Sequence, residues 1–519
     1  MQDILRRVKD AAAMTPVPRR RRVASIKNDE GLLTFPVPLF VIILPAYKED
    51  METLETTLRV LAAHPQARHS YHIYLAMEEK EEKSAFKAAN LCSTFEQSFY
   101  KMSYTIHPSG IPGEAQGKSS NESWAAKQAS EDYPDQAIKK NIVMTVMDAD
   151  THLSPRYFQQ ISRLHTEAAE TNESTIYVPP LIFDRNLHRV PLPVRTADLM
   201  WAGAGMSSLY AGSTVCIPTS VYSVPMTLVE HVGGWDTGPS AIGEDMHMYL
   251  KCFFALSGNL NVKVIYAPAS QCNVSSDKSG LLGYVDGLTA RYNQALRHMW
   301  GSLDSGFAVR ESVEMFARHR KANQPTLEMP TNASNTGFHK SMIPKLADTE
   351  HVPPKSINKV NLTILYHRLF EAHFLPTHLA VILTTTGLYD LFHPTHLVPG
   401  LLRWALDVSG WCRLCGFSLM IVYFYLYSKY HQICVGLRQE DMRRAGMLED
   451  MSENDEFTLK VFQFAGVFET CIFPLGGFIF GAIPALQAVI SHLFTERLVY
   501  VVSLKPQALA KRLSGTATP

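Results

Sequence analysis

The stretch Asn141-Ile-Val-Met-Thr-Val-Met-Asp-Ala-Asp150 decides the fold. Its continuous apolar run predicts a strand that is covered on both faces. The run ends in Asp148 and Asp150, whose side chains point the same way if the chain stays extended. Hard divalent cations bind carboxylate oxygens together with substrate phosphates, so this pair is a candidate cation site. Alternatively, one acid caps the next turn and the other is solvated.

Other short apolar runs share this pattern. The further strands that we expect are Leu39–Leu44, His72–Met77, Tyr104–His107 and Val262–Ala267. Helical patterns fall between them: Met51–Ala63 has leucines on one face, and Ser154 followed by Pro155 begins another helix. The alternation predicts a layered α/β domain over residues 38–303.

Polar residues follow the first expected strand, at Pro45, Tyr47 and Glu49. Ligands of open α/β sheets bind outside the carboxyl ends of the strands, so these residues are well placed for binding. Tyr47 can stack on a base, and Glu49 can accept a hydrogen bond from a base N–H or a ribose hydroxyl. An ordinary strand-to-helix turn is the alternative interpretation.

A second acidic motif, Gly243-Glu244-Asp245, precedes the amphipathic helix expected at Met246–Leu256. An acid at a helix start can simply be a cap. The positive end of the helix dipole also keeps such an acid ionised. An ionised aspartate could then accept the proton of an acceptor hydroxyl.

Two further segments carry groups that suit sugars and phosphates. Gln294 and Arg297 share a helix face, with Trp300 one step along, and arginine is the better phosphate partner because its planar fork is always charged. A surface helix with a half-buried tryptophan is the alternative. The residues before Lys118 lack the spacing of a P-loop, but a lysine at a helix start can still meet an anionic nucleotide.

In their order and spacing these motifs resemble glycosyltransferase family 2, the inverting enzymes of the GT-A fold that include cellulose, chitin and hyaluronan synthases. The residues that carry the likeness are Pro45-Ala-Tyr-Lys-Glu49, Gly117-Lys-Ser119, Asp148-Ala-Asp150, Gly243-Glu-Asp245 and Gln294–Trp300. The resemblance implies a GT-A, Rossmann-like nucleotide-sugar-binding domain. It also implies metal-dependent transfer of a sugar from a UDP- or GDP-sugar to a hydroxyl acceptor, which could be a lipid, a small molecule or a glycan.

The resemblance also assigns roles to single residues. The donor nucleotide would be contacted by Pro45, Tyr47, Glu49, Glu78, Lys118 and Asp148, although family members usually have an aspartate where Glu78 stands. Asp150, with Asp148, would bind Mg²⁺ or Mn²⁺. Asp245 would be the catalytic base, with Glu244 beside it. The acceptor and the diphosphate would be bound by Gln294, Arg297 and Trp300.

Two departures from the family weaken the case for a processive enzyme. Polymerising synthases have a QxxRW motif, whereas His298 and Met299 here separate the arginine from the tryptophan. Those synthases also have transmembrane helices before the catalytic domain, and we see none here. A processive polysaccharide synthase is therefore the alternative to a single transfer. A nucleotide-sugar-binding membrane scaffold is the alternative that is not an enzyme.

The C-terminal part changes character. Residues 304–361 read as an amphipathic segment and a flexible linker, residues 362–505 as membrane-associated helices, and residues 506–519 as a tail. A helix needs ~20 apolar residues to cross a bilayer. The apolar runs Phe374–Tyr389, Leu414–Tyr430 and Val461–Glu496 predict about three or four spans. A hydrophobic helical domain that stays soluble is the alternative.

Composition limits the remaining possibilities. Lys plus Arg and Asp plus Glu are both 49, so bulk charge gives no argument for a nucleic-acid partner. The basic arm at residues 1–37 has no apolar region typical of a secretory signal, and we expect it to be disordered. The eight cysteines do not have the spacing of a zinc site. We therefore expect an integral membrane protein whose catalytic domain faces the reducing cytosol, where nucleotide sugars are largely made.

Overall fold

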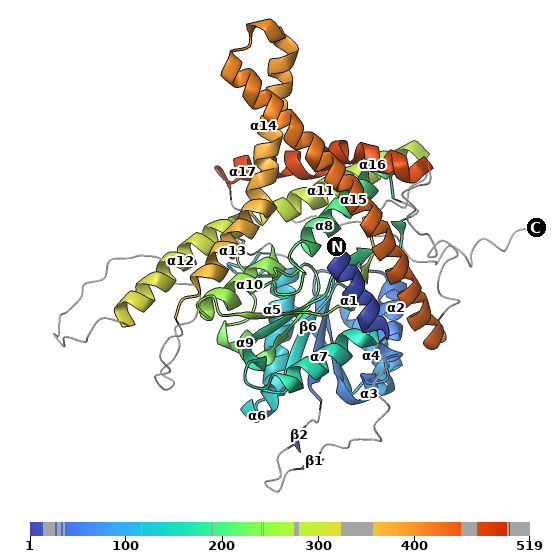
Figure 1. The fold of residues 1–519 in the computed structure, drawn as a ribbon. Coiled ribbons are helices and arrows are strands. Elements are labelled where there is room, and N and C mark those ends of the chain that lie inside the picture. The colour runs from blue at the N-terminus through green and yellow to red at the C-terminus, as the bar shows by residue number, and fades with distance from the viewer. Residues whose placement is uncertain are drawn as a thin grey trace, which may run out of the picture.

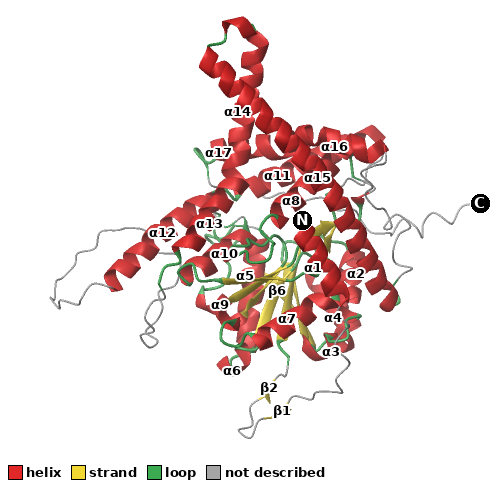
Figure 2. Cartoon of the chain, in the orientation of Figure 1, coloured by secondary structure: helices red, strands yellow, loops and turns green. Residues whose placement is uncertain are grey.

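The computed structural model describes residues 1–13, 26–27, 33–34, 37–115, 117–187, 190–239, 241, 243–274, 280–322, 356–447, 464–495 and 498. A seven-stranded sheet in the order β10-β7-β9-β6-β3-β4-β5 forms its centre, and helices cover both faces (Figures 1 and 2). Strands β6, β3, β4 and β5 run parallel, and β9 is antiparallel to its two neighbours. The predicted α/β domain is confirmed, and its architecture is that of the GT-A fold.

The strands have the following bounds. The central sheet contains β3 Leu39–Ala46, β4 Tyr71–Glu78, β5 Lys101–His107, β6 Ile142–Val146, β7 Thr175–Val178, β9 Tyr222–Pro225 and β10 Asn261–Val264. Two smaller sheets pair β1 Ile26–Lys27 with β2 Leu33–Thr34, and β8 Leu181–Phe183 with β11 Ala269–Gln271. The five strands predicted from the sequence are all present, with ends that shift by at most three residues.

The helices of the α/β domain are α2 Met51–Ala62, α3 Ala67–Ser70, α4 Ser84–Phe95, α5 Lys118–Asp132, α6 Gln136–Lys139, α7 Pro155–Glu167, α8 Leu192–Met206, α9 Met226–His231, α10 Glu244–Ala255 and α11 Gly280–Trp300. Outside it lie α1 Gln2–Ala13, α12 Leu303–Ala322, α13 Lys359–Leu369, α14 Leu375–Phe392, α15 Gly400–Arg444, α16 Phe464–Gly477 and α17 Ile483–Ser491. The predicted start of α7 is confirmed, because the Ser154 hydroxyl accepts a hydrogen bond from the Arg156 backbone N–H and Pro155 is the first helical residue.

Strand β3 shows why these runs form a doubly covered sheet. All of its residues are buried, and successive side chains of a strand point to opposite faces. Phe40, Ile42 and Leu44 belong to the core beneath α2 and α7. Leu39, Val41 and Ile43 belong to the core beneath α5 and α10. A continuous apolar run is therefore what both cores require.

The N-terminal segment corrects one expectation. Residues 2–13 of the basic arm form helix α1, so the prediction of disorder is wrong for this part. Ile4, Val8 and Ala11 recur at helical spacing and are buried. They belong to a face that docks on the α/β domain, where the Arg7 guanidinium lies 5.3 Å from the ring centroid of Tyr266. The rest of the predicted arm lies largely outside the described residues.

Ile4→Ala is expected to lower the free energy of unfolding by about 2–4 kcal/mol, because it removes buried methyl groups from this contact. Thermal unfolding of the purified full-length protein in detergent measures the change. Arg6→Ala is the matched control, since its side chain is 69% exposed. Equal melting temperatures for the two variants would contradict the docking of α1.

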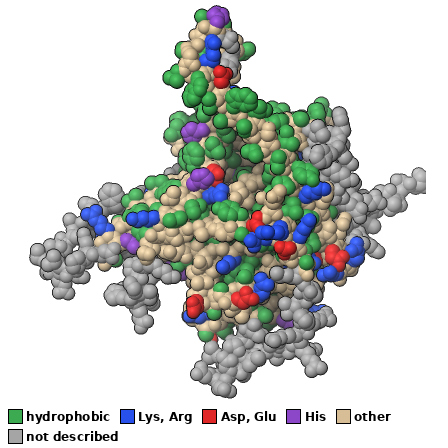
Figure 3. All heavy atoms as spheres, in the orientation of Figure 1, with side chains coloured by type: hydrophobic (Ala, Val, Ile, Leu, Met, Phe, Trp, Pro, Cys, Tyr) green, Lys and Arg blue, Asp and Glu red, His purple; other side chains and the backbone are tan. Residues whose placement is uncertain are grey.

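The C-terminal helices form a separate layer. Helix α14 and the first half of α15 project together away from the α/β domain, while α16 and α17 lie across its upper side (Figure 1). Apolar side chains gather on the projecting part (Figure 3), among them Trp404, Trp411 and Leu419, which are exposed. The predicted linker falls mainly on residues 323–355, outside the described part of the chain.

Within the described residues, two helical segments are long and apolar enough to cross a membrane: Gly400–Arg444 and Thr470–Ser491. The most apolar window of the first is 0% buried, and that of the second is 33% buried. The run predicted at Phe374–Tyr389 forms α14 but is not among these candidates. The described residues thus supply two candidate spans, where we expected three or four.

Candidate active site

The predicted ligand-binding edge of the sheet is formed by the carboxyl ends of β3, β4 and β6. Ala46 pairs with Met77, so Glu78 lies beside the turn that carries Tyr47. Strand β6 is the other neighbour of β3, and Asp148 follows its end. Because these strands are parallel, residues from three distant parts of the sequence reach one edge.

The turn after β3 is held by backbone and acidic contacts. The Tyr47 backbone N–H donates to Glu49 Oε2 at 2.5 Å, and Lys48 has a left-handed φ of 68°. At the end of β4, Glu78 lies 3.2 Å from Nδ1 of His107. Burial raises the pKa of Glu78, and the His107 contact opposes that rise. The predicted nucleotide-contacting residues Tyr47, Glu49 and Glu78 therefore share this edge.

One largely buried lysine, with its side chain 15% exposed, joins the two acidic motifs. Lys118 is the first residue of α5. Its Nζ atom lies 3.2 Å from Asp148, 2.8 Å from Glu244 and 3.8 Å from Asp245. The same atom lies 3.4 Å from Glu122, one helical turn along α5. We call these five residues the Lys118 cluster, and they bring together motifs almost 100 positions apart in the sequence.

Charge coupling in the Lys118 cluster shifts its pKa values. Burial alone would lower the pKa of Lys118, but the surrounding carboxylates raise it well above its usual value, so the ammonium stays charged. Burial also raises the pKa of Asp245 to about 7, with Lys118 opposing and Glu244 and Asp148 adding to the rise. The sequence led us to expect an aspartate kept ionised by the helix start. Instead, burial places its titration near neutrality, where a general base is most effective.

A tight turn at residues 233–237 supports both helices of the cluster. On the α5 side, Ser119 and Ser123 donate to the carbonyls of Asp236 and Trp235 at 2.6 and 2.9 Å. On the α10 side, Lys251 donates to the carbonyl of Gly234 at 2.7 Å. The turn therefore fixes Lys118 relative to Glu244 and Asp245.

A buried ion-pair network lies directly behind α10. His247 contacts Asp304 at 2.6 Å and Asp236 at 2.9 Å through its two ring nitrogens. Burial lowers the pKa of His247, but the two aspartates outweigh it and raise that pKa to about 9. At neutral pH the imidazolium therefore links α12, α10 and the supporting turn. The backbone N–H of Ser220 completes the arrangement by donating to Asp245 Oδ2 at 2.7 Å.

The acidic groups fit a divalent cation that arrives with a diphosphate. Burial raises the pKa of Glu122 well above its usual value, which favours its neutral form. The three remaining carboxylates of the Lys118 cluster still outnumber its one ammonium, so a further cation would balance the excess negative charge. Among the described residues, no three His, Cys, Asp or Glu side chains are grouped to hold a metal by themselves. Mg²⁺ is typically bound by one or two carboxylates with substrate phosphates completing its shell. Asp148 faces the cluster, whereas Asp150 is only 2% exposed and its carbonyl accepts from Arg185.

The segment Gln294–Trp300 ends α11 as predicted, but its members separate. Gln294 and Arg297 are half-buried. His298 stacks on Trp201 at 4.7 Å between ring centroids. Trp300 is 4% exposed and packs against Ala485 and Ala488 of α17, with the His492 ring 4.5 Å away. Trp300 therefore contacts the C-terminal helices and is not part of the Lys118 cluster.

Sequence reasoning missed several residues of this site. Glu122 stands one helical turn after Lys118, which is a usable signal for an ion pair on a helix. Arg185, Ser220 and the His247–Asp304 pair gave no local signal, because they reach the site only through the tertiary fold. The predicted acids Asp148, Glu244 and Asp245 do meet around Lys118.

The fold and this acidic cluster define a glycosyltransferase-like α/β domain, and the sequence identifies its family. Residues 143–428, more than half of the chain, match the profile of glycosyl transferase family group 2. The chain therefore belongs to this family and is a glycosyltransferase. The resemblance inferred from the motifs is confirmed. No curated protein matches the sequence significantly.

Several solved structures are similar in part. The mannosyltransferase PcManGT from Pyrobaculum calidifontis, in complex with GDP-Man and Mn²⁺, is 13% identical over 86% of this chain and 94% of its own, with a TM-score of 0.39. Glucosyl-3-phosphoglycerate synthase from Mycobacterium tuberculosis, in complex with UDP, is 10% identical over 47% of this chain and 74% of its own, with a TM-score of 0.28.

Proposed function

We propose that this glycosyltransferase moves a sugar from a UDP- or GDP-sugar to a hydroxyl acceptor in one in-line displacement that inverts the anomeric centre. The observation that supports this most is the Lys118 cluster, because one ammonium lies within 4 Å of carboxylates from both acidic motifs. A donor held at Asp148 would thus meet the candidate base Asp245 at the same place. The neighbouring turn with Tyr47 and Glu49 suits the nucleotide.

Asp245 would take the proton from the acceptor hydroxyl. Its Oδ2 accepts from the Ser220 backbone N–H, which fixes the direction of the carboxylate. Lys118 and Glu244 lie close on its other side. A base that is held in place and titrates near neutrality contributes about 10²–10⁴-fold to such a reaction.

Asp150 and Asp148 would hold Mg²⁺ or Mn²⁺ together with the donor diphosphate. When bound, the cation supplies Lewis-acid stabilisation of the charge that grows on the departing nucleoside diphosphate. Arg297, half-buried at the end of α11, would add a fixed positive charge for the same group. Gln294 would bind the acceptor or diphosphate beside it. Trp300 would support the acceptor side through its packing on α17, because its ring is buried.

The value of kcat/KM for the donor is expected to fall below about pH 7, by about tenfold per pH unit, because protonated Asp245 cannot accept the acceptor proton. Burial raises the pKa of this group to about 7, and kcat/KM reports the free enzyme. Above that value the rate should level off. Initial rates across the pH range test this, with each sample re-assayed near neutrality as the control for denaturation. A flat profile through neutrality would contradict the role of Asp245.

We place the protein in a membrane with its catalytic domain in the cytosol and favour a single transfer to a lipid or amphipathic acceptor. The apolar first half of α15 is exposed, and leaving so much apolar surface in water is unfavourable. The two candidate spans among the described residues are few for a polymer channel.

The proposed function is tested by incubating membranes that contain the protein with labelled UDP- and GDP-sugars and sizing the products. We expect one lipid-extractable product that depends on a divalent cation. A ladder of products would instead establish the processive synthase. Binding of nucleotide sugars without any product would support the scaffold alternative and contradict the proposal.

A further inference from the structure

Helix α15 has two halves with different surroundings. Its first half is the exposed apolar segment described above. From Phe424 onward, Phe424, Tyr427, Tyr430 and Cys434 are buried in the same core as β3 and β6. A single continuous helix thus runs from the candidate membrane span to the catalytic sheet.

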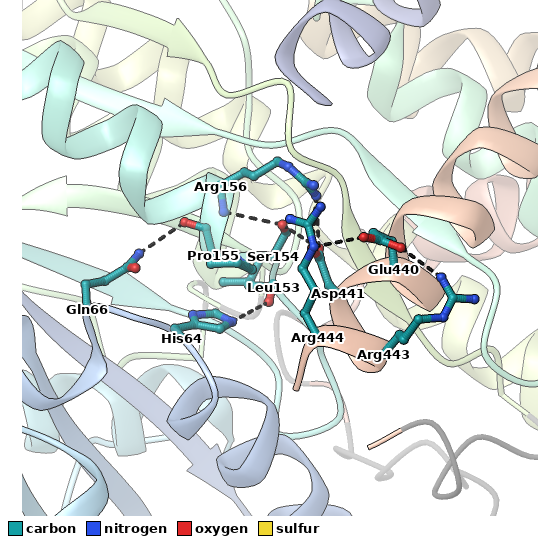
Figure 4. Close-up of polar contacts among 10 residues, drawn as sticks. All are labelled: His64, Gln66, Leu153, Ser154, Pro155, Arg156, Glu440, Asp441, Arg443 and Arg444. Carbon is teal, nitrogen blue, oxygen red and sulfur yellow. Dashed lines mark hydrogen bonds and ion pairs between the residues drawn. The ribbon is translucent and has the colours of Figure 1, made fainter. Parts of the chain in front are cut away.

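The end of α15 is bonded to the start of α7. Asp441 accepts from the Ser154 hydroxyl at 2.7 Å and from Arg156 Nη1 at 3.0 Å (Figure 4). The Arg156 and Asp441 side chains are both largely buried. Ser154 lies four residues after Asp150, so this contact holds the segment that leaves the acidic pair.

One turn earlier on α15, a second contact reaches the same segment through Asp184 and Ser270. Arg438 Nε donates to Asp184 Oδ2 at 2.9 Å, and both side chains are buried. The Ser270 hydroxyl donates to the other oxygen of Asp184 at 2.5 Å. Ser270 and His152 exchange backbone hydrogen bonds of 2.8 and 3.0 Å. Arg438 is therefore linked to the residue two positions after Asp150.

The opposite side of residues 149–155 is held by the α2–α3 region. Thr57 donates to the carbonyl of Ala149 at 2.7 Å. His64 Nε2 and Gln66 Nε2 donate to the carbonyls of Leu153 and Pro155, each at 3.1 Å (Figure 4). Residues 149–155 are thus held between the α2–α3 region on one side and α15 on the other. Carboxylates that are held in this way lose less freedom when they bind a cation and a diphosphate.

We propose that Arg438 and Asp441 are positioning residues through which α15 holds one side of residues 149–155. The helix that carries the candidate membrane span therefore also sets the geometry of Asp148 and Asp150. This inference rests on the proposed donor site. It explains why the ion pair between Arg156 of α7 and Asp441 of α15 is largely buried just after the acidic pair in the sequence.

The test uses the full-length protein in detergent and measures Mn²⁺-dependent binding of UDP and GDP by calorimetry, together with donor KM and kcat. Asp441→Ala is expected to weaken nucleotide binding about 10- to 100-fold, as partners that orient metal ligands typically do. Donor KM should rise by a similar factor, with a smaller change in kcat and in acceptor KM.

Glu440→Ala is the matched control. Glu440 lies on the same turn of α15. Its carboxylate pairs with Arg443 and Arg444, whose side chains are exposed (Figure 4). This variant should bind nucleotide like the wild type. Asp441→Asn, which keeps an acceptor for Ser154, replaces Asp441→Ala if the alanine variant does not fold.

Exchanging the charges of residues 156 and 441 tests whether the ion pair between them supports nucleotide binding. The double variant Arg156→Asp/Asp441→Arg should bind nucleotide more tightly than either single variant. If Asp441→Ala binds UDP and GDP as tightly as Glu440→Ala does, the inference is overturned while the proposed donor site stands. If the wild type binds neither nucleotide with Mn²⁺, or if Asp148→Ala and Asp150→Ala both bind like the wild type, the donor site itself fails and the inference falls with it.

Discussion

Asp245→Asn is expected to reduce sugar transfer about 10³-fold while the donor still binds, because the amide cannot accept the proton of the acceptor hydroxyl. Asparagine has almost the same shape and keeps an oxygen for the Ser220 backbone N–H. Lys118 retains Glu122, Asp148 and Glu244 as partners. The loss should therefore appear in kcat, with donor KM changed little.

Steady-state transfer and calorimetric donor binding measure the two effects separately. Glu167→Gln is the control, since this acid lies on the surface of α7 with its side chain 62% exposed. Turnover of Asp245→Asn near that of the wild type, with donor still bound, would rule out Asp245 as the base. Glu244 would then be the next carboxylate to test, because it lies nearest to Lys118.

Asp150→Ala is expected to reduce transfer by about 10²–10³-fold, because charge stabilisation of the leaving diphosphate is lost. Unlike the change at Asp245, this one should abolish the Mn²⁺ dependence of UDP or GDP binding. Asp148→Ala should weaken nucleotide binding as well, and it also removes one partner of Lys118.

The comparison with Asp148 decides how the pair divides its work. If Asp150→Ala keeps Mn²⁺-dependent nucleotide binding and Asp148→Ala loses it, the cation belongs to Asp148, which faces the Lys118 cluster. If neither change affects that binding, the metal site is wrong. Thermal unfolding should accompany both measurements, since Asp150 is only 2% exposed in the folded protein.

The sheet was predictable because its strands are buried on both faces and so consist of continuous apolar runs. β3 and β6 are the clearest examples. The motif with Asp148 and Asp150 was predictable for a related reason. Apolar packing does not account for carboxylates that directly follow a buried strand. Strand ends were less certain because turns such as that at Lys48 depend on contacts with other elements.

The remaining features depend on contacts between distant segments. Lys118 reads as a helix-start lysine, but only the fold shows that four carboxylates from three regions surround it. The apolar face of α1 was hidden by the basic residues that follow it. Trp300 looked like a binding residue, because the sequence does not show that α17 covers it.

The central claim is that the Lys118 cluster performs a single displacement with Asp245 as base. The anomeric configuration of the product, read by proton NMR as soon as it forms from a donor of known configuration, tests this most directly. We expect an inverted anomeric centre in the first product. A retained configuration would contradict it, because retention requires another route than one in-line attack by the acceptor hydroxyl.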